Sequence, residues 1–97
     1  IVTAFESASY RQTGSDAVSI TFYRVARSGH AKTSMASQSN STTGADQVIT
    51  TTGIAHTVDG TAFSYYVEGL LNPNAANNNA RLYEFTVIGD QSDVTQS

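Results

Sequence analysis

The fold of this chain is decided by one alternating stretch near its start, Ala17-Val18-Ser19-Ile20-Thr21-Phe22-Tyr23-Arg24-Val25-Ala26-Arg27. Large apolar residues occupy every second position from Val18 to Phe22, and residues with a hydroxyl group fill the positions between them. Side chains of a strand point alternately to its two faces, so this pattern predicts a β-strand with one face in a core and one toward water. Residues 14–16 and 28–29 carry Gly, Ser and Asp, which are typical of the turns that bound a strand.

Two further strands are expected in the final half of the chain. Residues 62–71 have one apolar face, formed by Phe63, Tyr65, Val67 and Leu71. Residues 81–88 have apolar side chains on both faces, with Tyr83, Phe85 and Val87 on one and Leu82 and Ile88 on the other. The second pattern is typical of a strand that is covered on both faces, at least in part.

Turn signals connect these strands. Residues 48–58 alternate imperfectly through threonines, and the Asp59-Gly60 pair that follows favours a two-residue hairpin, because Gly accepts positive φ and Asp tolerates it. Asn72-Pro73-Asn74 ends the next strand, since Pro donates no hydrogen bond to a sheet. The sequence therefore predicts an antiparallel meander from residue 48 to residue 88.

The remaining segments give weaker signals. Residues 1–10 alternate poorly, and residues 28–47 are mostly small and polar, which predicts a long connection with a short edge strand at residues 33–37. Together these patterns predict an all-β protein, an antiparallel β-sandwich of jelly-roll type with a C-terminal β-meander. We expect a single domain over residues 1–90 and a polar tail or linker over residues 91–97.

Composition excludes several classes of function. Charged residues make up 13% of the chain, the formal net charge is −3, and no basic run occurs, so nucleic-acid binding is not expected. No stretch approaches the roughly 18–20 consecutive apolar residues of a membrane span, and the absence of Cys removes disulfides and Cys-based zinc sites. Abundant Ser, Thr and Asn with few charges is typical of secreted, cell-surface and virion proteins, so we expect a virion or extracellular location.

No pattern of residues points to catalysis. His30 lies in the long polar segment and His56 lies near the predicted turn, and neither has a metal-binding or nucleophilic partner at the required spacing. Glu68 and Glu84 fall on neighbouring predicted strands, where two carboxylates could act in glycoside hydrolysis. A polar outer face with arginines nearby explains them more simply. We expect no enzyme, no catalytic residue, no metal and no cofactor.

Self-association is the expected mode of action. The predicted contact surface comprises Tyr23, Tyr66, Glu68, Leu70 and Tyr83. Leu70 falls outside the apolar alternation, which fits either a contact with another subunit or packing beneath its own loop. The loops at residues 28–47 and 72–80 are candidate ligand-binding loops, and their candidate residues are His30, Asn72, Asn74, Asn77 and Asn78.

Two segments of the final half carry a resemblance to a known group of proteins: His56-Thr57-Val58-Asp59-Gly60-Thr61-Ala62-Phe63-Ser64-Tyr65-Tyr66-Val67-Glu68 and Asn79-Ala80-Arg81-Leu82-Tyr83-Glu84-Phe85-Thr86-Val87. They resemble the terminal hairpin of small β-sandwich modules at the ends of phage tail fibres, spikes and virion surface appendages. The pair Glu84-Phe85 departs from that pattern, in which a small or basic residue is more usual. The resemblance implies a trimer-forming module for capping, cementing or attachment, without catalytic residues.

These observations predict a non-enzymatic virion structural protein, a phage capsid decoration or cement protein or a tail-fibre module, that self-assembles. We expect a homo-oligomer, with a trimer favoured, and other virion or surface proteins as partners, but no nucleic acid and no membrane. One alternative is a module that binds a carbohydrate or a receptor through the two loops, with a glycan as partner. Another is a subunit of an extracellular filament, joined to its neighbours by exchange of the polar termini.

Overall fold

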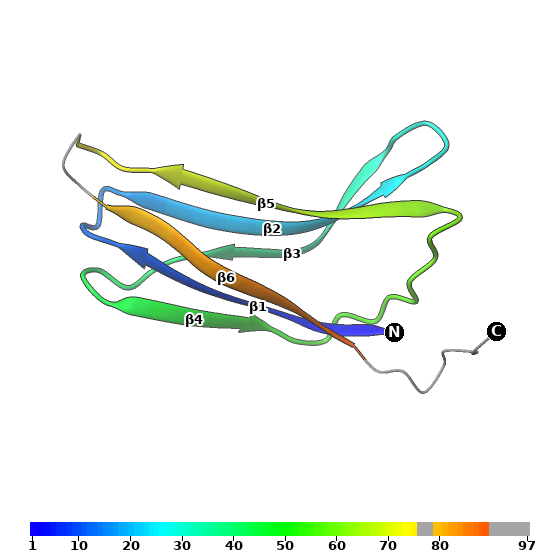
Figure 1. The fold of residues 1–97 in the computed structure, drawn as a ribbon, viewed down its shortest axis with the longest axis horizontal. Coiled ribbons are helices and arrows are strands. Elements are labelled where there is room, and N and C mark those ends of the chain that lie inside the picture. Colours follow the sequence, from blue (N-terminus) through cyan, green and yellow to red (C-terminus); the bar gives the residue numbers. More distant parts are fainter. Residues whose placement is uncertain (76–78, 90–97) are drawn as a thin grey trace.

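The computed structural model describes residues 1–75 and 79–89, and in these residues the chain is built from β-strands without a helix. The six strands are β1 Val2–Arg11, β2 Ala17–Ala26, β3 Lys32–Ser39, β4 Asp46–Thr51, β5 Phe63–Asn72 and β6 Ala80–Gly89. They form two antiparallel three-stranded sheets, β4-β1-β6 and β3-β2-β5, which face each other as two layers (Figure 1). The all-β prediction is confirmed, whereas the expected tail at residues 91–97 lies outside the described residues.

Strand β2 forms where the alternation predicts it and is the middle strand of its sheet. Its apolar residues Val18, Ile20 and Phe22 are buried against the other layer. Its pairing with β5 runs through ten residue pairs, from Ala17 opposite Asn72 at one end to its last residue opposite Phe63 at the other. The β2–β5 pairing therefore runs without interruption along the whole length of this sheet.

The weakest strand signal in the sequence belongs to the middle strand of the other sheet. Strand β1 pairs with both β4 and β6, and Phe5 on it is fully buried. The inward positions that follow Phe5 are held by Ser7 and Ser9, which are also buried. Because these residues are small and polar, hydrophobic alternation does not reveal the strand.

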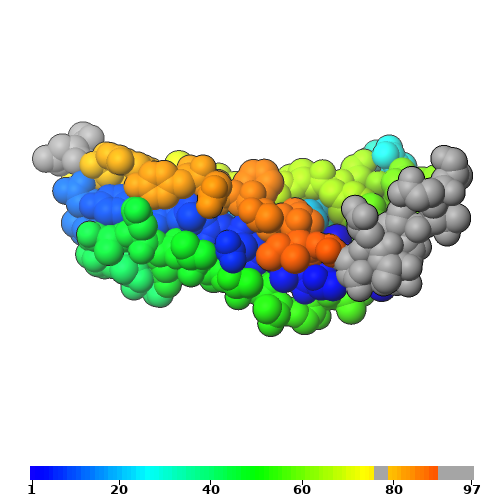
Figure 2. Space-filling model, turned by 60° about the horizontal axis from the view of Figure 1, so that its bottom comes forward, coloured from blue at the N-terminus to red at the C-terminus, as the bar shows by residue number. Residues whose placement is uncertain are grey.

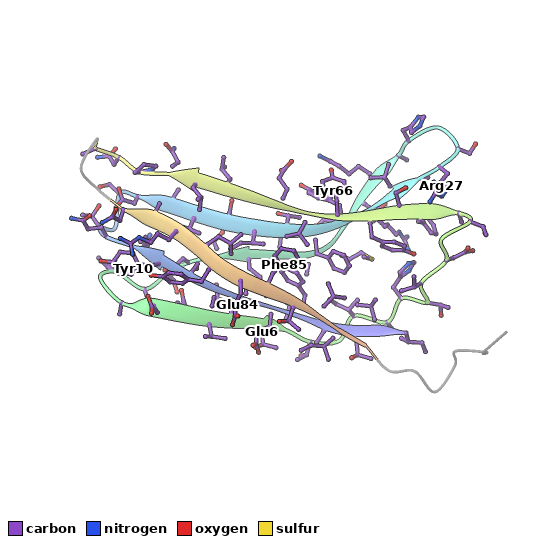
Figure 3. The ribbon with its side chains drawn as sticks, in the orientation of Figure 1. Glu6, Tyr10, Arg27, Tyr66, Glu84 and Phe85 are labelled. Atoms are coloured by element: carbon purple, nitrogen blue, oxygen red, sulfur yellow. The ribbon has the colours of Figure 1, made fainter. Side chains whose placement is uncertain are left out.

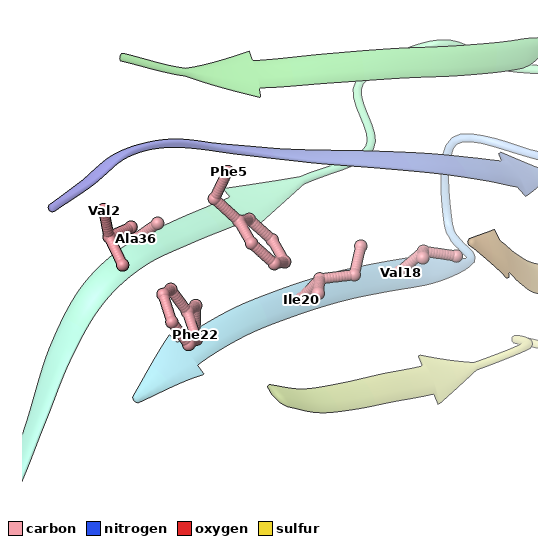
Figure 4. Packing of buried hydrophobic residues seen from close by; sticks show 6 residues of the cluster. All are labelled: Val2, Phe5, Val18, Ile20, Phe22 and Ala36. Atoms are coloured by element: carbon pink, nitrogen blue, oxygen red, sulfur yellow. The ribbon is translucent and has the colours of Figure 1, made fainter. Parts of the chain in front are cut away.

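An apolar cluster joins the middle strands of the two layers. Its buried members are Val2, Phe5, Val18, Ile20, Phe22 and Ala36 (Figure 4). The rings of Phe5 and Phe22 stack with their centroids 5.4 Å apart. Full burial of a side chain of this size contributes roughly 1.5–3 kcal/mol relative to exposure, so this cluster from the first 36 residues is the main apolar contact between the layers.

The interior on the β3 and β4 side is polar. Gln38 reaches from β3 to the facing sheet, where its Nε2 donates to the carbonyls of Phe5 and Ile49, each at 3.1 Å, and to Oγ1 of Thr51 at 2.9 Å. Its Oε1 accepts a hydrogen bond from Ser7 Oγ. Asn40 Nδ2 likewise donates to Ser9 Oγ at 2.9 Å. Buried polar groups cost free energy unless they are bonded, and these bonds join the two layers.

The connections in the final half differ from the prediction. Strand β4 pairs with β1, β5 with β2 and β6 with β1, so the predicted C-terminal meander is wrong for the described residues. The short edge strand expected at residues 33–37 is part of the longer edge strand β3. A jelly roll has eight strands, and that topology stays a prediction.

Asp59 and Gly60 form a turn, but not the predicted hairpin. Asp59 Oδ1 accepts hydrogen bonds from N of Thr61 at 2.9 Å and from its Oγ1 at 2.6 Å. These bonds lower the pKa of the Asp59 carboxyl group. The turn leads the connection after β4 into β5, which belongs to the other sheet. Turn chemistry predicts that the chain bends, but not which strand it meets afterwards.

Candidate functional site

One long side of the molecule is open and apolar. Strands β5 and β6 are the edge strands of different sheets and lie on this same side (Figure 1). Of nine large apolar side chains that are exposed in the described residues, seven belong to these two strands: Tyr66, Leu70, Leu71, Tyr83, Phe85, Val87 and Ile88. In the space-filling view β6 (orange) runs along the surface above β1 (blue), with β5 (yellow-green) behind it (Figure 2).

A pocket of about 410 Å³ opens between the layers on this side. Its lining is apolar and aromatic and includes Phe22, Val58, Tyr65, Val67, Phe85 and Val87. The ring of Phe85 stacks on Phe5 at a centroid distance of 6.2 Å, yet its side chain remains 50% exposed (Figure 3). The interior of the protein is thus continuous with the surface at this point.

The pairing of β6 with β1 explains why apolar side chains gather at the opening. Ala8 of β1 lies opposite Glu84, but the next residue, Ser9, lies opposite Leu82. Tyr83 is therefore the extra residue of a β-bulge. The bulge lets Leu82 and Phe85 point into the same interior face. A Cβ on Gly69 of β5 would lie 3.1 Å from Leu82 Cδ2, so a glycine here allows the two edge strands to approach.

A chain of hydrogen bonds borders the pocket at Tyr65. Arg24 Nη1 lies 2.9 Å from Nδ1 of His56, and His56 Nε2 lies 2.8 Å from Oη of Tyr65. The same Oη accepts a 2.9 Å hydrogen bond from the backbone N–H of Asp59. Because a guanidinium can only donate, Nδ1 accepts and the protonated Nε2 donates to Tyr65. Burial, followed by the positive charge of Arg24, lowers the pKa of His56 and favours the neutral ring.

The outer face of the β3-β2-β5 sheet carries a second aromatic group. Tyr23 on β2 lies opposite Tyr66 on β5, and their rings stack with centroids 5.1 Å apart. Lys32 Nζ lies 4.4 Å from the centroid of the Tyr23 ring. A hydrogen bond with Tyr66, followed by the electrostatic influence of the Tyr66 and Tyr23 side chains, raises the pKa of Lys32. This face is therefore amphipathic and carries a cation.

The structure brings together four of the five predicted contact residues. Tyr23, Tyr66, Glu68 and Leu70 all point outward from the β3-β2-β5 sheet, as their pairing with β2 requires. Tyr83 belongs to β6 in the other layer and does not join them. Leu70 is 60% exposed, so it does not pack beneath its own loop.

The candidate residues of the two predicted ligand loops do not form one site. His30 is exposed in the turn after β2, where it and Gly29 have positive φ. Asn72 pairs with the first residue of β2, and Asn74 follows it, donating its backbone N–H to Asp16 Oδ1 at 2.7 Å. The full length of β2 therefore separates His30 from Asn72 and Asn74. Residues 40–45, which also belong to the first predicted loop, lie at the same end of the fold as the second loop, where Arg11 Nε donates to the carbonyl of Thr42 and the backbone N–H of Gln12 donates to the carbonyl of Asn79. Asn77 and Asn78 lie outside the described residues.

The structure also separates the two carboxylates that could have acted together. Glu68 lies opposite Thr21 on one sheet and Glu84 opposite Ala8 on the other, so they point to opposite outer faces. Within residues 1–75 and 79–89, no three His, Cys, Asp or Glu side chains gather as a metal site would require. The same residues contain no helix with the length and apolar character to cross a membrane.

The sequence indicates the apolar residues of the open side more clearly than the buried amides on the opposite side. Phe85 and Val87 share one face in the alternation, but nothing in the sequence indicates that their strand is an edge. Gln38 and Asn40 lie in a polar segment without a hydrophobic signal. The only hint of their burial is that they alternate with Ser37, Ser39 and Ser41, in step with a strand.

Comparison of the chain with protein-family models, with curated proteins and with solved structures gave no match.

Proposed function

We propose that this protein is a non-enzymatic structural module that assembles with copies of itself through the open side formed by β5 and β6. The observation that carries the proposal is the concentration of seven exposed large apolar side chains on two neighbouring edge strands. Monomeric soluble proteins rarely expose apolar surface in one large contiguous patch, and such patches mark interaction sites. Pairing along β5 and β6 would cover the members of this group that point between the layers, Leu71, Phe85 and Val87.

The free edges themselves support the proposal. Strands β5 and β6 are each ten residues long, and within residues 1–75 and 79–89 one edge of each has a long row of backbone N–H and C=O groups without a neighbouring strand. Natural proteins usually protect such edges with prolines, several charges or a covering segment. Here β5 carries one charged residue, Glu68, and β6 carries two, Arg81 and Glu84. These edges are suited to pairing with another strand.

A virion or other surface assembly is the proposed setting. The low content of charged residues and the abundance of Ser, Thr and Asn support it, as does the resemblance of residues 56–68 and 79–87 to appendage modules. Capsid decoration, cementing and a place in a tail fibre are the corresponding roles. The trimer implied by the resemblance remains a prediction for a mass measurement.

The two alternatives have less support. A carbohydrate-binding or receptor-binding site that uses the candidate residues of both predicted loops is disfavoured because β2 separates His30 from Asn72 and Asn74. A filament formed by exchange of the polar termini is disfavoured at the N-terminal end, because β1 is the middle strand of its sheet, and the C-terminal end lies outside the described residues. Removal of β1 would leave β4 and β6 without a partner in the same chain.

The proposal is tested by the solution mass of the protein, measured by light scattering across a concentration series. We expect an oligomer that dissociates on dilution, and we expect Phe85→Ser to shift the transition to higher concentration. Val48→Ser is the matched control, because Val48 is 62% exposed but lies on β4, away from the open side. A wild-type protein that remains monomeric at every concentration would contradict the proposal.

A further inference from the structure

The directions of the two edge strands limit how copies can pair. Strands β1 and β2 run in opposite directions and are joined by residues 12–16 (Figure 1). Strand β6 is antiparallel to β1 and β5 is antiparallel to β2, so β5 and β6 run in opposite directions. A rotation axis parallel to the strands keeps these directions. It therefore sets β5 of one copy antiparallel to β6 of the next.

We propose that the partner on the open side is one second copy of this chain, related by a two-fold axis parallel to the strands, with β5 of each copy paired to β6 of the other. This inference rests on the proposed self-assembly and specifies its geometry. A half turn exchanges the two layers of the sandwich. The sheet β3-β2-β5 of one copy then continues into β6-β1-β4 of the second, and both layers become six-stranded antiparallel sheets.

The same half turn covers the apolar pocket. The pocket opens between the layers beside β5 and β6, so the openings of the two copies face each other across the axis. Phe85, Val67 and Val87 of each copy then line one shared interior. Both free edges of each copy gain a partner in one contact that is the same on both sides, as in most symmetric dimers.

Sheet geometry favours two copies over the three that the resemblance implies. Neighbouring strands of a sheet are rotated by only about 20–25° relative to each other. A half turn sets the two joined layers in line, which permits a regular hydrogen-bonded ladder. A third of a turn would set them at a steep angle, and a regular ladder between β5 and β6 would be lost.

Charge complementarity selects the register of the ladder. Alternation of the two faces allows only registers that differ by steps of two residues. Glu68 is the one charged residue on β5, and it points outward. On β6 the outward charges are Arg81 and Glu84, and like charges directly opposite each other are destabilising. Glu68 therefore faces Arg81 of the second copy, which also sets Tyr66 opposite Tyr83.

The test uses Glu68→Arg and Arg81→Glu, two charge reversals on exposed positions. Each variant alone would hold two like-charge contacts per pair, and we expect its dissociation constant to rise about tenfold or more. An equimolar mixture of the two variants restores both Glu–Arg contacts. Light scattering and native mass spectrometry should show the mixture forming a 1:1 complex with the affinity of the wild type.

The mixture separates two-fold from three-fold assembly. A ring of three copies cannot alternate two variants, so at least one like-charge contact would remain in it. Glu6→Arg is the control, because it changes the charge equally on the outer face of β1, where Glu6 accepts a 2.9 Å hydrogen bond from Thr50. We expect it to leave the mass unchanged. Glu84→Arg should not tighten the pair, and tightening would overturn the proposed register.

The outcomes also separate this inference from the proposed function. A wild type that is monomeric at all concentrations contradicts self-assembly itself. A wild-type oligomer whose single variants are not rescued by mixing, or whose mass is that of three chains, overturns the two-fold pairing and leaves self-assembly standing.

Discussion

The Nε2 atom of His56 lies 2.8 Å from the phenolic oxygen of Tyr65, while the other ring nitrogen receives a hydrogen bond from Arg24. Both nitrogens are thus occupied in a way that only a neutral imidazole permits. A protonated ring would bring two N–H groups, and a second positive charge, against a guanidinium. The charge state of one side chain therefore decides whether the residues around Tyr65 keep their arrangement.

We predict that stability falls in mild acid because of His56. Burial, and then the charge of Arg24, lowers the pKa of His56 in the folded protein. In the unfolded chain the pKa is about 6.5, so the unfolded chain binds a proton first. The contribution of neutral His56 to the free energy of unfolding is fully present above about pH 6.5, and it is lost as the pH falls from there toward the lowered pKa of the folded protein.

Chemical denaturation at pH 7.5 and pH 5.0 measures this loss. His56→Gln should reduce the difference between the two pH values, because glutamine does not titrate. His30→Asn is the control, since His30 is exposed and Asn tolerates its positive φ. An equal reduction in both variants would contradict the role of His56.

Removal of the Gln38 side chain is expected to destabilise the fold although it deletes no apolar contact. Gln38 is buried, and Gln38→Ala would leave the hydroxyl of Ser7 and the carbonyl of Phe5 without their partner. A buried polar group left unbonded costs about 1–3 kcal/mol, and we expect a loss in that range in urea denaturation. Ser39→Ala, at the next exposed position of β3, should change stability by less than about 0.5 kcal/mol.

Leu70→Asp should weaken assembly and leave the single chain folded. Leu70 points outward from β5, so a carboxylate there is hydrated in the monomer. In the proposed register it lies opposite residue 79 of the second copy, where it loses part of that hydration. We expect the concentration for half-dissociation to rise at least about tenfold, with unchanged circular dichroism. Val48→Asp on β4 is the matched control. An unfolded Leu70→Asp monomer would mean that Leu70 is part of the core.

Deletion of residues 1–10 should abolish folding altogether. This segment supplies nearly all of β1, which pairs with β4 and β6, and it supplies the fully buried Phe5. The amide resonances of the truncated chain should collapse to the narrow range of an unfolded chain. A dispersed spectrum would show that β4 and β6 can find another partner.

The sequence allows the prediction of strands whose inward residues are apolar. Strand β2 is the clearest example, because Val18, Ile20 and Phe22 both form the core and create the alternation. Strand β1 is harder to predict because Ser7 and Ser9 occupy inward positions, where their hydroxyl groups are bonded to Gln38 at the end of β3 and to Asn40 just after it. Those bonds join residues about thirty positions apart, which no local pattern contains.

The open side is predictable only in part for the same reason. The alternation identifies the apolar faces of β5 and β6, and it identifies Leu70 and Tyr66 as outward residues. The alternation does not show that β5 pairs with β2 and β6 with β1. Only this pairing places both strands at the edges of their sheets on the same side of the molecule. The turn at Asp59 is local and is recognisable, whereas the sheet that the chain enters after it depends on contacts far away in the sequence.

The buried amides of Gln38 and Asn40 have a consequence for the size that an assembly of this chain can reach. They tie the layers together on the flank of β3 and β4, so the two flanks of the sandwich are chemically unlike. A building block that adheres through both flanks adds further blocks without limit and becomes a fibre. A block that adheres through one flank stops growing once that flank has met its counterpart, and the particle it forms has a fixed size.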